Sequence, residues 1–325
     1  MAGSLAASVG AMPDDSGRCA WPAAVLLSAV VEVKTIKPNL TIAHRSHPRT
    51  YRDFFYVYPV ISRRSHGLSI GINLTPNKVC SFGCAYCQVD RATPPKVSML
   101  VLATLERELR QMVDLVQSGT LASEYPFNTA LDLATRVNDI ALSGDGEPTA
   151  ARQFQEVVRI VQRVKRETGL QDAKVVLITN GTGLDRADVR AGLKLMDEDH
   201  GEVWAKLDAG SEQYFKQVNR TAVAFSRILK NLMTVARGRP ITLQSLFMRL
   251  HGESPPDVEI EAYCDRLREI LQSGGKIKLV QVYTVVRKPL EPWVGPLTDG
   301  ELDSIAARIR QKTGLAVETF GGGRA

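Results

Sequence analysis

The chain has 325 residues, of which 44% are hydrophobic and 23% are charged. This balance is typical of a soluble globular protein and excludes the disordered and fibrous classes. The length suffices for one α/β barrel-type domain or for two smaller domains. No apolar run reaches the roughly 20 residues that cross a bilayer, and the longest, from Ala20 to Val31, contains Pro22 and Ser28. The sequence therefore predicts a cytoplasmic protein without a membrane segment.

Three parts follow one another along the chain. Residues 1–40 show no clear pattern and are interpreted as a poorly specified N-terminal extension. Residues 41–290 form the predicted main domain, which begins with a basic and aromatic lead-in. Residues 291–325 are predicted to be a C-terminal helix and a tail.

Positive charge is concentrated between Thr41 and Lys96. Eight basic residues lie there against Asp53 and Asp90, so this segment carries +6, which is also the net charge of the whole chain. It is either a solvated basic surface or a site for an anionic partner, such as tRNA, a phosphorylated substrate or an acidic electron donor. The aromatic residues in it are suited to base stacking or to the core of a leading pair of strands; they are Tyr51, Phe54, Phe55, Tyr56 and Tyr58.

From residue 68 onward, short apolar runs alternate with helical patterns. The predicted strands are residues 68–74, 139–142, 174–179, 203–207, 241–247 and 277–283. The predicted helices are residues 98–117, 151–167, 183–197, 222–237, 257–272 and 299–313. Successive βα units predict a parallel sheet with right-handed crossovers, and six are too few to close the eight-stranded barrel. The expected fold class is α/β, an open partial (β/α)6 parallel barrel.

Polar and glycine-rich segments follow the predicted strands at their carboxyl ends. The first strand leads into a cysteine-containing loop, the second into Ser-Gly-Asp-Gly-Glu-Pro, and the third into Asn180-Gly181. The fourth leads into Asp208-Ala209-Gly210. Binding groups in parallel α/β folds gather at this edge of the sheet, so the sequence predicts a site there.

Three of the five cysteines have the spacing Cys80-x3-Cys84-x2-Cys87. An odd number with three clustered does not fit a secreted disulfide framework and indicates a metal or redox site in a reducing compartment. Thiolates on a short flexible loop can converge on an iron–sulfur cluster, and three ligands leave one iron of a four-iron cluster open. Zinc is the alternative, although it normally needs a fourth Cys or His. Cys264, within a helical pattern, is predicted to be a core residue.

The cysteine spacing, with Tyr86 just before the third cysteine, resembles the signature of the radical S-adenosylmethionine (SAM) superfamily. The resemblance covers residues 68–285. It implies that Cys80, Cys84 and Cys87 ligate a [4Fe–4S] cluster whose open iron binds SAM. It further implies reductive cleavage of SAM to a 5′-deoxyadenosyl radical that abstracts hydrogen from a substrate, on a partial barrel of the radical SAM type.

A second motif carries the same resemblance. Gly144-Asp145-Gly146-Glu147-Pro148 resembles the Gly-Gly-Glu-Pro segment that meets the SAM amino group in this superfamily. Asp145 stands where the usual form has glycine, and its added carboxylate can reach substrate or cofactor. The alternative is a plain strand-to-helix turn in which Glu147 and Pro148 open the helix.

Less specific motifs assign further residues on later strands to the SAM site. Asn180 is expected beside the ribose, unless it only begins a helix. Lys206 and Asp208 lie on one strand face by the period of two and resemble, in reversed order, an Asp/Lys pair that some members use for the ribose and carboxylate of SAM. Gln244 lies in an apolar strand, and as a buried amide it needs a partner, for which SAM or substrate is one choice. Tyr86 completes this predicted set.

The segment that begins at Tyr58 and runs into the cysteines resembles bacterial radical SAM proteins grouped loosely with wyosine-type tRNA synthetases. One predicted function is therefore modification of a tRNA base. Wyosine synthases carry a second cluster on further N-terminal cysteines, and here only Cys19 is available. The main prediction is thus a single-cluster enzyme of unidentified substrate, served by a flavodoxin- or ferredoxin-type electron donor. A non-catalytic, metal-stabilised nucleic-acid-binding module is the alternative of a different class.

Overall fold

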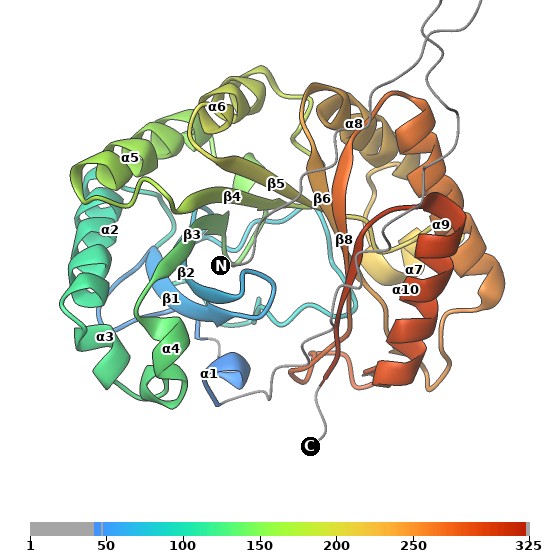
Figure 1. The fold of residues 1–325 in the computed structure, drawn as a ribbon, viewed down its shortest axis with the longest axis horizontal. Helices are drawn as coiled ribbons and strands as arrows, with labels where there is room; N and C mark the ends of the chain where they lie inside the picture. Colours follow the sequence, from blue (N-terminus) through green and yellow to red (C-terminus); the bar gives the residue numbers. More distant parts are fainter. Residues whose placement is uncertain (1–41, 47, 323–325) are drawn as a thin grey trace, which may run out of the picture. The chain divides into compact units, whose positions relative to one another are not determined.

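The computed structural model describes residues 42–46 and 48–322, so the predicted extension over residues 1–40 lies outside the described residues. The centre of the fold is a sheet that curls into an open half-barrel (Figure 1), with the strand order β1-β2-β3-β4-β5-β6-β8-β10. The strands are β1 Val57–Ser62, β2 Gly67–Asn73, β3 Val137–Ser143, β4 Lys174–Thr179, β5 Gly201–Lys206, β6 Ile241–Leu246, β8 Ile277–Tyr283 and β10 Val317–Phe320. All neighbours from β2 to β10 are parallel, and only β1 runs antiparallel to its neighbour β2.

The open, parallel α/β fold confirms the predicted fold class, and the six predicted strands correspond to β2, β3, β4, β5, β6 and β8. The six predicted strands do not include the two edge strands, although a leading pair of strands was one interpretation of the aromatic residues that end at Tyr58. β1 contains Pro59, which is tolerated because it lies on an edge strand. β10 has only four residues and lies in the C-terminal segment that was predicted as a helix and a tail. It pairs with β8.

Six longer helices cover the outside of the curved sheet (Figure 1). They are α2 Leu102–Gln117, α5 Phe154–Glu167, α6 Ala187–Asp197, α8 Phe225–Gly238, α9 Asp257–Gln272 and α10 Asp299–Thr313. Each matches a predicted helix within a few residues at its start. The apolar residues that predicted these helices form their buried faces. In α5 these residues are Phe154, Val157, Val158, Val161 and Val164, and all are fully buried.

Shorter elements complete the described chain. They are α1 Ile42–Arg45, α3 Thr120–Ser123, α4 Leu131–Ala134, α7 Glu212–Asn219, the 3-10 turns Phe127–Ala130 and Pro148–Ala150, and the paired strands β7 Arg249–Leu250 and β9 Val294–Gly295. Within residues 42–46 and 48–322, no helix is long and apolar enough to cross a membrane.

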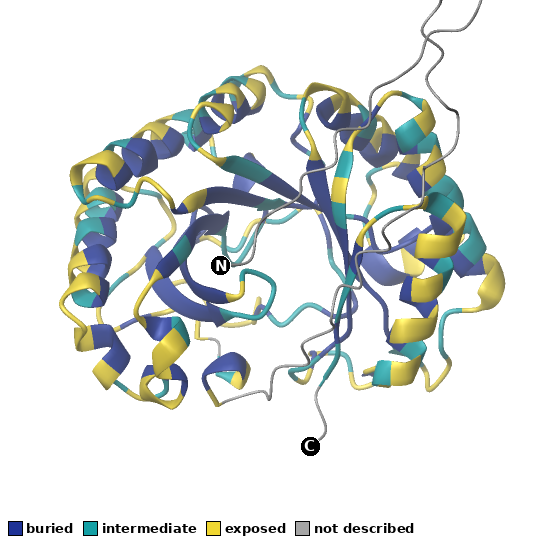
Figure 2. Ribbon diagram, viewed as in Figure 1, coloured by how far each residue is buried: buried dark blue, intermediate teal, exposed yellow. Residues whose placement is uncertain are grey.

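The main core lies between the helices and the outer face of the sheet. Figure 2 shows the helices buried where they face the strands and exposed on the outside. The inner face carries more polar side chains, and the register aligns Lys206 of β5 with Gln244 of β6 and Gln281 of β8. Parallel strands end at one edge of the sheet, so the loops after β2, β3, β4 and β5 meet there.

Gly210, just after β5, has no room for a side chain. A Cβ at this position would lie 2.0 Å from the backbone nitrogen of Tyr263 and 2.4 Å from the carbonyl carbon of Ala262, both in α9. Gly210→Ala must therefore push α9 outward, and we expect the free energy of unfolding in urea to fall by about 1–3 kcal/mol.

The matched control is Gly238→Ala at the end of α8, where an added Cβ meets nothing within 4 Å. We expect this variant to be as stable as the parent or more stable by up to about 1 kcal/mol, because alanine favours the helix. Equal destabilisation of both variants would contradict the close approach of Gly210 to α9.

Candidate active site at the carboxyl edge of the half-barrel

The loop after β2 carries Cys80, Cys84 and Cys87, which are free, half-buried thiols. Other elements hold its backbone in place. The N–H groups of Gly83 and Ala85 donate to carbonyls at the end of α7, over 3.0 and 2.8 Å, and Val79 O accepts from the N–H of Glu147 over 3.0 Å. The loop is thus anchored on both sides by chain segments far away in sequence.

Amide donors face two of the three sulfurs. Asn180 Nδ2 lies 3.6 Å from Cys80 Sγ, and Asn219 Nδ2 lies 3.5 Å from Cys84 Sγ. Burial raises the pKa of both thiols, to about 11 for Cys84, where the Asp208 carboxylate adds to the effect. Hydrogen bonds to sulfur are among the features that tune iron–sulfur clusters.

Three thiols on one short loop are the type of donor that binds iron–sulfur clusters. Among the described residues, no three His, Cys, Asp or Glu side chains are close enough to hold one ion. The cysteine loop instead offers three thiols with amide donors beside two of them. Clusters are bound by thiolates, whereas structural zinc takes four ligands in a tight tetrahedron. Cys264 is buried in α9, and the ligation of a cluster by Cys80, Cys84 and Cys87 stays a prediction.

The turn after β3 packs directly on the cysteine loop. Gly144 has φ +135°, and a Cβ there would lie 2.4 Å from Asn73 Oδ1. A Cβ at Gly146 would lie 2.0 Å from Val79 O. Both positions therefore require glycine, which explains the two glycines of the predicted motif.

Asp145 is held by two partners. Its carboxylate accepts from Asn73 Nδ2 over 2.9 Å and pairs with Arg49 over 3.1 Å. The aspartate that departs from the usual motif thus connects β2 and the segment before β1 to the turn after β3. Its predicted contact with cofactor or substrate stays a prediction.

Glu147 is buried, and its carboxylate accepts four hydrogen bonds. Oε1 accepts from Thr149 N, Thr149 Oγ1 and Thr179 Oγ1 over 3.1, 2.6 and 2.5 Å. Oε2 accepts from Asn180 N over 2.8 Å. Desolvation raises the pKa of this carboxyl, and these donors oppose that rise. Glu147 thus opens the 3-10 turn and ties it to the end of β4, and its predicted contact with the SAM amino group stays a prediction.

Tyr86, Lys206 and Asp208 meet beside the cysteine loop. The Tyr86 hydroxyl donates to Asp208 Oδ2 and accepts from Lys206 Nζ over 3.1 Å. Asp208 also accepts from Asn219 Nδ2 and from Leu246 N, each over 3.0 Å. Burial disfavours the charge of Lys206, but Tyr283 and Asp208 outweigh it and raise the pKa of the ammonium.

Gln244 lies apart from the cysteines, on the inner face of β6. Its Nε2 donates to Gln281 Oε1 over 2.9 Å, whereas its own buried Oε1 accepts no hydrogen bond. A buried amide oxygen without a partner is costly, so a donor from a ligand would stabilise it. The predicted contact between Gln244 and SAM or substrate is untested.

The motifs did not indicate several residues of this site. Asn73, Asn219 and Tyr283 contact predicted residues from β2, the end of α7 and the end of β8. Asn219 precedes Arg220, whose φ of +44° ends α7. In the sequence, these residues are distinguished only by their position at the end of a helix or strand. Many polar residues share that position, so it does not identify a site.

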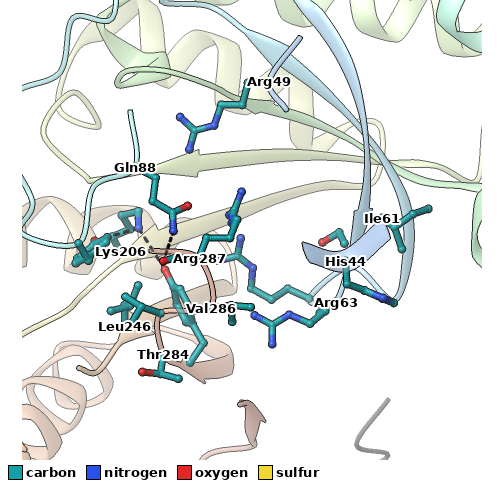
Figure 3. Close-up of a pocket in the computed structure, with 15 residues that line it drawn as sticks. His44, Arg49, Ile61, Arg63, Gln88, Lys206, Leu246, Thr284, Val286 and Arg287 are labelled. Atoms are coloured by element: carbon teal, nitrogen blue, oxygen red, sulfur yellow. Dashed lines mark hydrogen bonds between the residues drawn. The ribbon is translucent and has the colours of Figure 1, made fainter. Parts of the chain in front are cut away.

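A cavity of about 180 Å³ opens beside Tyr86 and Lys206 (Figure 3). Several cationic side chains reach it from different elements, namely Arg49, Arg63, Arg64, Lys206 and Arg287. Three of these five cationic side chains, Arg49, Arg63 and Arg64, thus come from the basic lead-in of the sequence. Of the aromatic residues of that lead-in, Tyr51, Tyr56 and Tyr58 are buried in the core, whereas Phe54 is half-buried and Phe55 is exposed.

Comparison with known proteins gives relatives but no family assignment. No protein-family model matches the chain. It is 26% identical over 253 residues to the GTPase Obg of Brachyspira hyodysenteriae, which covers 75% of this chain and 32% of that protein. It is 24% identical over 214 residues to a UPF0026 protein of Helicobacter pylori J99, which covers 65% of this chain and 61% of that protein. A UPF0026 protein of Methanocaldococcus jannaschii is 31% identical over 163 residues, half of this chain and 43% of that protein. The chain thus spans less than two thirds of the length of each of these relatives.

Two solved structures are similar in fold. A radical SAM methyltransferase from Sphaerobacter thermophilus has a TM-score of 0.55 at 13% identity, over 81% of this chain and 68% of that chain. TYW1 with a lysine-pyruvate adduct bound has a TM-score of 0.50 at 13% identity, over 76% of this chain and 74% of that chain. At this identity the likeness shows the fold, a curled parallel half-barrel.

Glu147→Gln tests the structural part of this site. The amide keeps one acceptor but turns an N–H group toward Asn180 N, so that two donors face each other. We expect the free energy of unfolding in urea to fall by about 1–3 kcal/mol.

The control is Glu156→Gln on α5, an exposed residue whose pair with Arg159 spans 3.7 Å. Its stability should stay within about 0.5 kcal/mol of the parent. If Glu147→Gln were equally stable, the four hydrogen bonds would not be what fixes the turn.

Proposed function

We propose that the protein is a radical SAM enzyme with one [4Fe–4S] cluster. The observation that carries this proposal is the shared location of its parts. The loop with Cys80, Cys84 and Cys87 packs on the glycine turn after β3, and both lie at the carboxyl edge of a half-barrel. The fold likeness to two proteins, one of them named a radical SAM methyltransferase, supports it.

In this proposal the three cysteines hold the cluster, and SAM lies against the loop ends after β3, β4 and β5. When bound, the cluster and SAM supply a one-electron cleavage of the sulfonium that yields a 5′-deoxyadenosyl radical, and this radical abstracts hydrogen from a substrate. The residues assigned to SAM are Tyr86, Gly144, Asp145, Gly146, Glu147, Asn180, Lys206, Asp208 and Gln244.

The chain's own residues prepare this site. The glycine turn lets the backbone approach the cysteine loop without side chains between them. Lys206 keeps its ammonium between the hydroxyls of Tyr86 and Tyr283, over 3.1 and 3.2 Å, where it can attract a carboxylate. Asn180 and Asn219 place N–H groups on two sulfurs and thereby stabilise negative charge on them.

The proposal includes a cytoplasmic location and a flavodoxin- or ferredoxin-type electron donor, because cluster chemistry of this kind needs a low-potential electron and a reducing compartment. A tRNA substrate remains a prediction that the positive charge of the basic lead-in supports.

Anaerobic reconstitution with iron and sulfide, followed by dithionite and SAM, tests the proposal. We expect about four iron ions per chain and release of 5′-deoxyadenosine. Cys84→Ala should lower cluster content and SAM cleavage at least ~100-fold while the circular dichroism of the fold is retained, because the loop backbone is anchored independently of the thiol.

Cys264→Ala is the matched control, since this cysteine is buried in α9 away from the loop. It should keep both iron content and SAM cleavage. A protein that is restored by zinc alone and never cleaves SAM would overturn the proposal in favour of a metal-stabilised binding module.

A further inference from the structure

The cavity beside Tyr86 and Lys206 is lined by an unbalanced set of charges. Five cationic side chains reach it, and among the described residues that line it none is acidic. They come from separate parts of the chain: Arg49 before β1, Arg63 and Arg64 after β1, Lys206 at the end of β5, and Arg287 after β8. Figure 3 shows Arg49, Arg63, Lys206 and Arg287 approaching one space from different sides.

Most of these charges lack a carboxylate partner. Arg49 pairs with Asp145, but within residues 42–46 and 48–322 no ion pair joins Arg63, Arg64 or Arg287 to an acidic side chain. Arg63 donates to the carbonyl of Gly321, and Arg64 lies 4.8 Å above the Tyr283 ring. The backbone carbonyl of Arg287 accepts from Gln88 over 2.8 Å, and this contact fixes the segment and leaves the guanidinium available.

The electrostatics of the arginines agree with this geometry. Burial, and then the charge of Arg64, lowers the pKa of Arg63 to about 10. Burial, and then the charges of Arg49, Arg64 and Arg63, lowers the pKa of Arg287 to about 10 as well. Both groups stay protonated at neutral pH, so half-buried like charges face one another, and the Asp299 carboxylate offsets only part of this repulsion at Arg63. An anion between them would remove this repulsion.

The cavity also adjoins the candidate active site. Tyr86 and Gln88, which flank Cys87 in sequence, line it together with Lys206. SAM offers one carboxylate against its sulfonium and ammonium cations, and Lys206 alone can attract that carboxylate, so the three arginines without an ion pair are not matched by SAM. The ligand that these charges suit is therefore a second molecule beside the cofactor.

We propose that this cavity binds a small substrate that carries at least two negative charges on phosphate or carboxylate oxygens. Guanidinium groups match such oxygens with two parallel hydrogen bonds. The identification of this ligand as the substrate rests on the proposed radical SAM function. The binding of an anion in the cavity does not depend on that function.

Size and lining favour a small molecule over a nucleic acid. The cavity has about 180 Å³ and includes apolar walls from Ile61, Leu246 and Val285. Of the five aromatic side chains of the basic lead-in, Tyr51, Tyr56 and Tyr58 are buried in the core, where bases cannot stack on them, and Phe55 alone is exposed.

Isothermal titration of the full chain with inorganic pyrophosphate, at constant ionic strength and without SAM, tests the proposal. We expect one saturable site, and Arg287→Gln should weaken binding at least ~10-fold, the effect of losing one charged hydrogen-bonding group. The matched control is Lys288→Gln, which removes the same charge from the next residue, an exposed side chain outside the cavity. It should change the affinity less than about twofold.

A parallel titration with citrate separates the two oxyanion sources, and the tighter ligand identifies phosphate or carboxylate. Absence of saturable binding up to about 10 mM, or equal weakening by both variants, would overturn the proposal. So would bulk tRNA that binds more tightly than either small anion and depends on Arg287. The titration does not measure SAM cleavage, so the two proposals are tested separately. A protein that binds the anion but does not cleave SAM in the assay above would contradict only the proposed function. A protein that cleaves SAM but binds no anion would contradict only this inference.

Discussion

Buried carboxylates that accept backbone N–H groups hold the loops of this half-barrel. Glu147 binds the end of β4, Asp208 binds the backbone of Leu246, and Glu259 of α9 accepts from Gly210 N over 2.5 Å and from Ser211 N over 3.3 Å. Glu108 of α2 does the same for the N–H groups of residues 55–57, where the chain enters β1. A buried charge must be surrounded by donors, so each of these side chains fixes the shape of a loop that regular sheet hydrogen bonds do not reach.

Backbone hydrogen bonds fix the cysteine loop against its neighbours. Contacts from the end of α7 and from the turn after β3 hold it, and an extra methyl group at Gly146 would collide with its backbone. The half-buried thiols therefore lie on a loop whose backbone is fixed next to the glycine turn. A preformed site of this kind loses less conformational entropy when it binds its ligand.

The repeated βα pattern was readable in the sequence because buried parallel strands are short apolar runs and the helices have one apolar face. The six predicted strands and six predicted helices follow from that regularity. β1 was ambiguous because Pro59 interrupts its pattern, and β10 because four residues carry little periodicity. Both lie at the sheet edges, where one side of the strand has no neighbour.

The site was predictable only where one segment carries the signal. The cysteine spacing and Gly144–Glu147 are local motifs, so their shared edge could be inferred from the strand rule. The partners of these residues come from elsewhere: Asn219 reaches Cys84 across 135 positions, and Tyr58 reaches Ser143 across 85. No pattern within a single segment encodes such pairs. Glu147 shows a further limit, because its type and position fit both a ligand and a structural acceptor, and the four donors around it become visible only in three dimensions.

The arginine-lined cavity is built mainly by segments that flank the repeated units, before and after β1 and after β8, while the cysteines and glycines belong to the loops of the units themselves. The two sets of residues can therefore change separately during evolution. Replacement of Arg63, Arg64 or Arg287 would alter what the cavity accepts without disturbing the turn that Gly144 and Gly146 form. In this scaffold, divergence of specificity requires few substitutions, and these fall on connecting segments where the packing of the sheet imposes the weakest constraint.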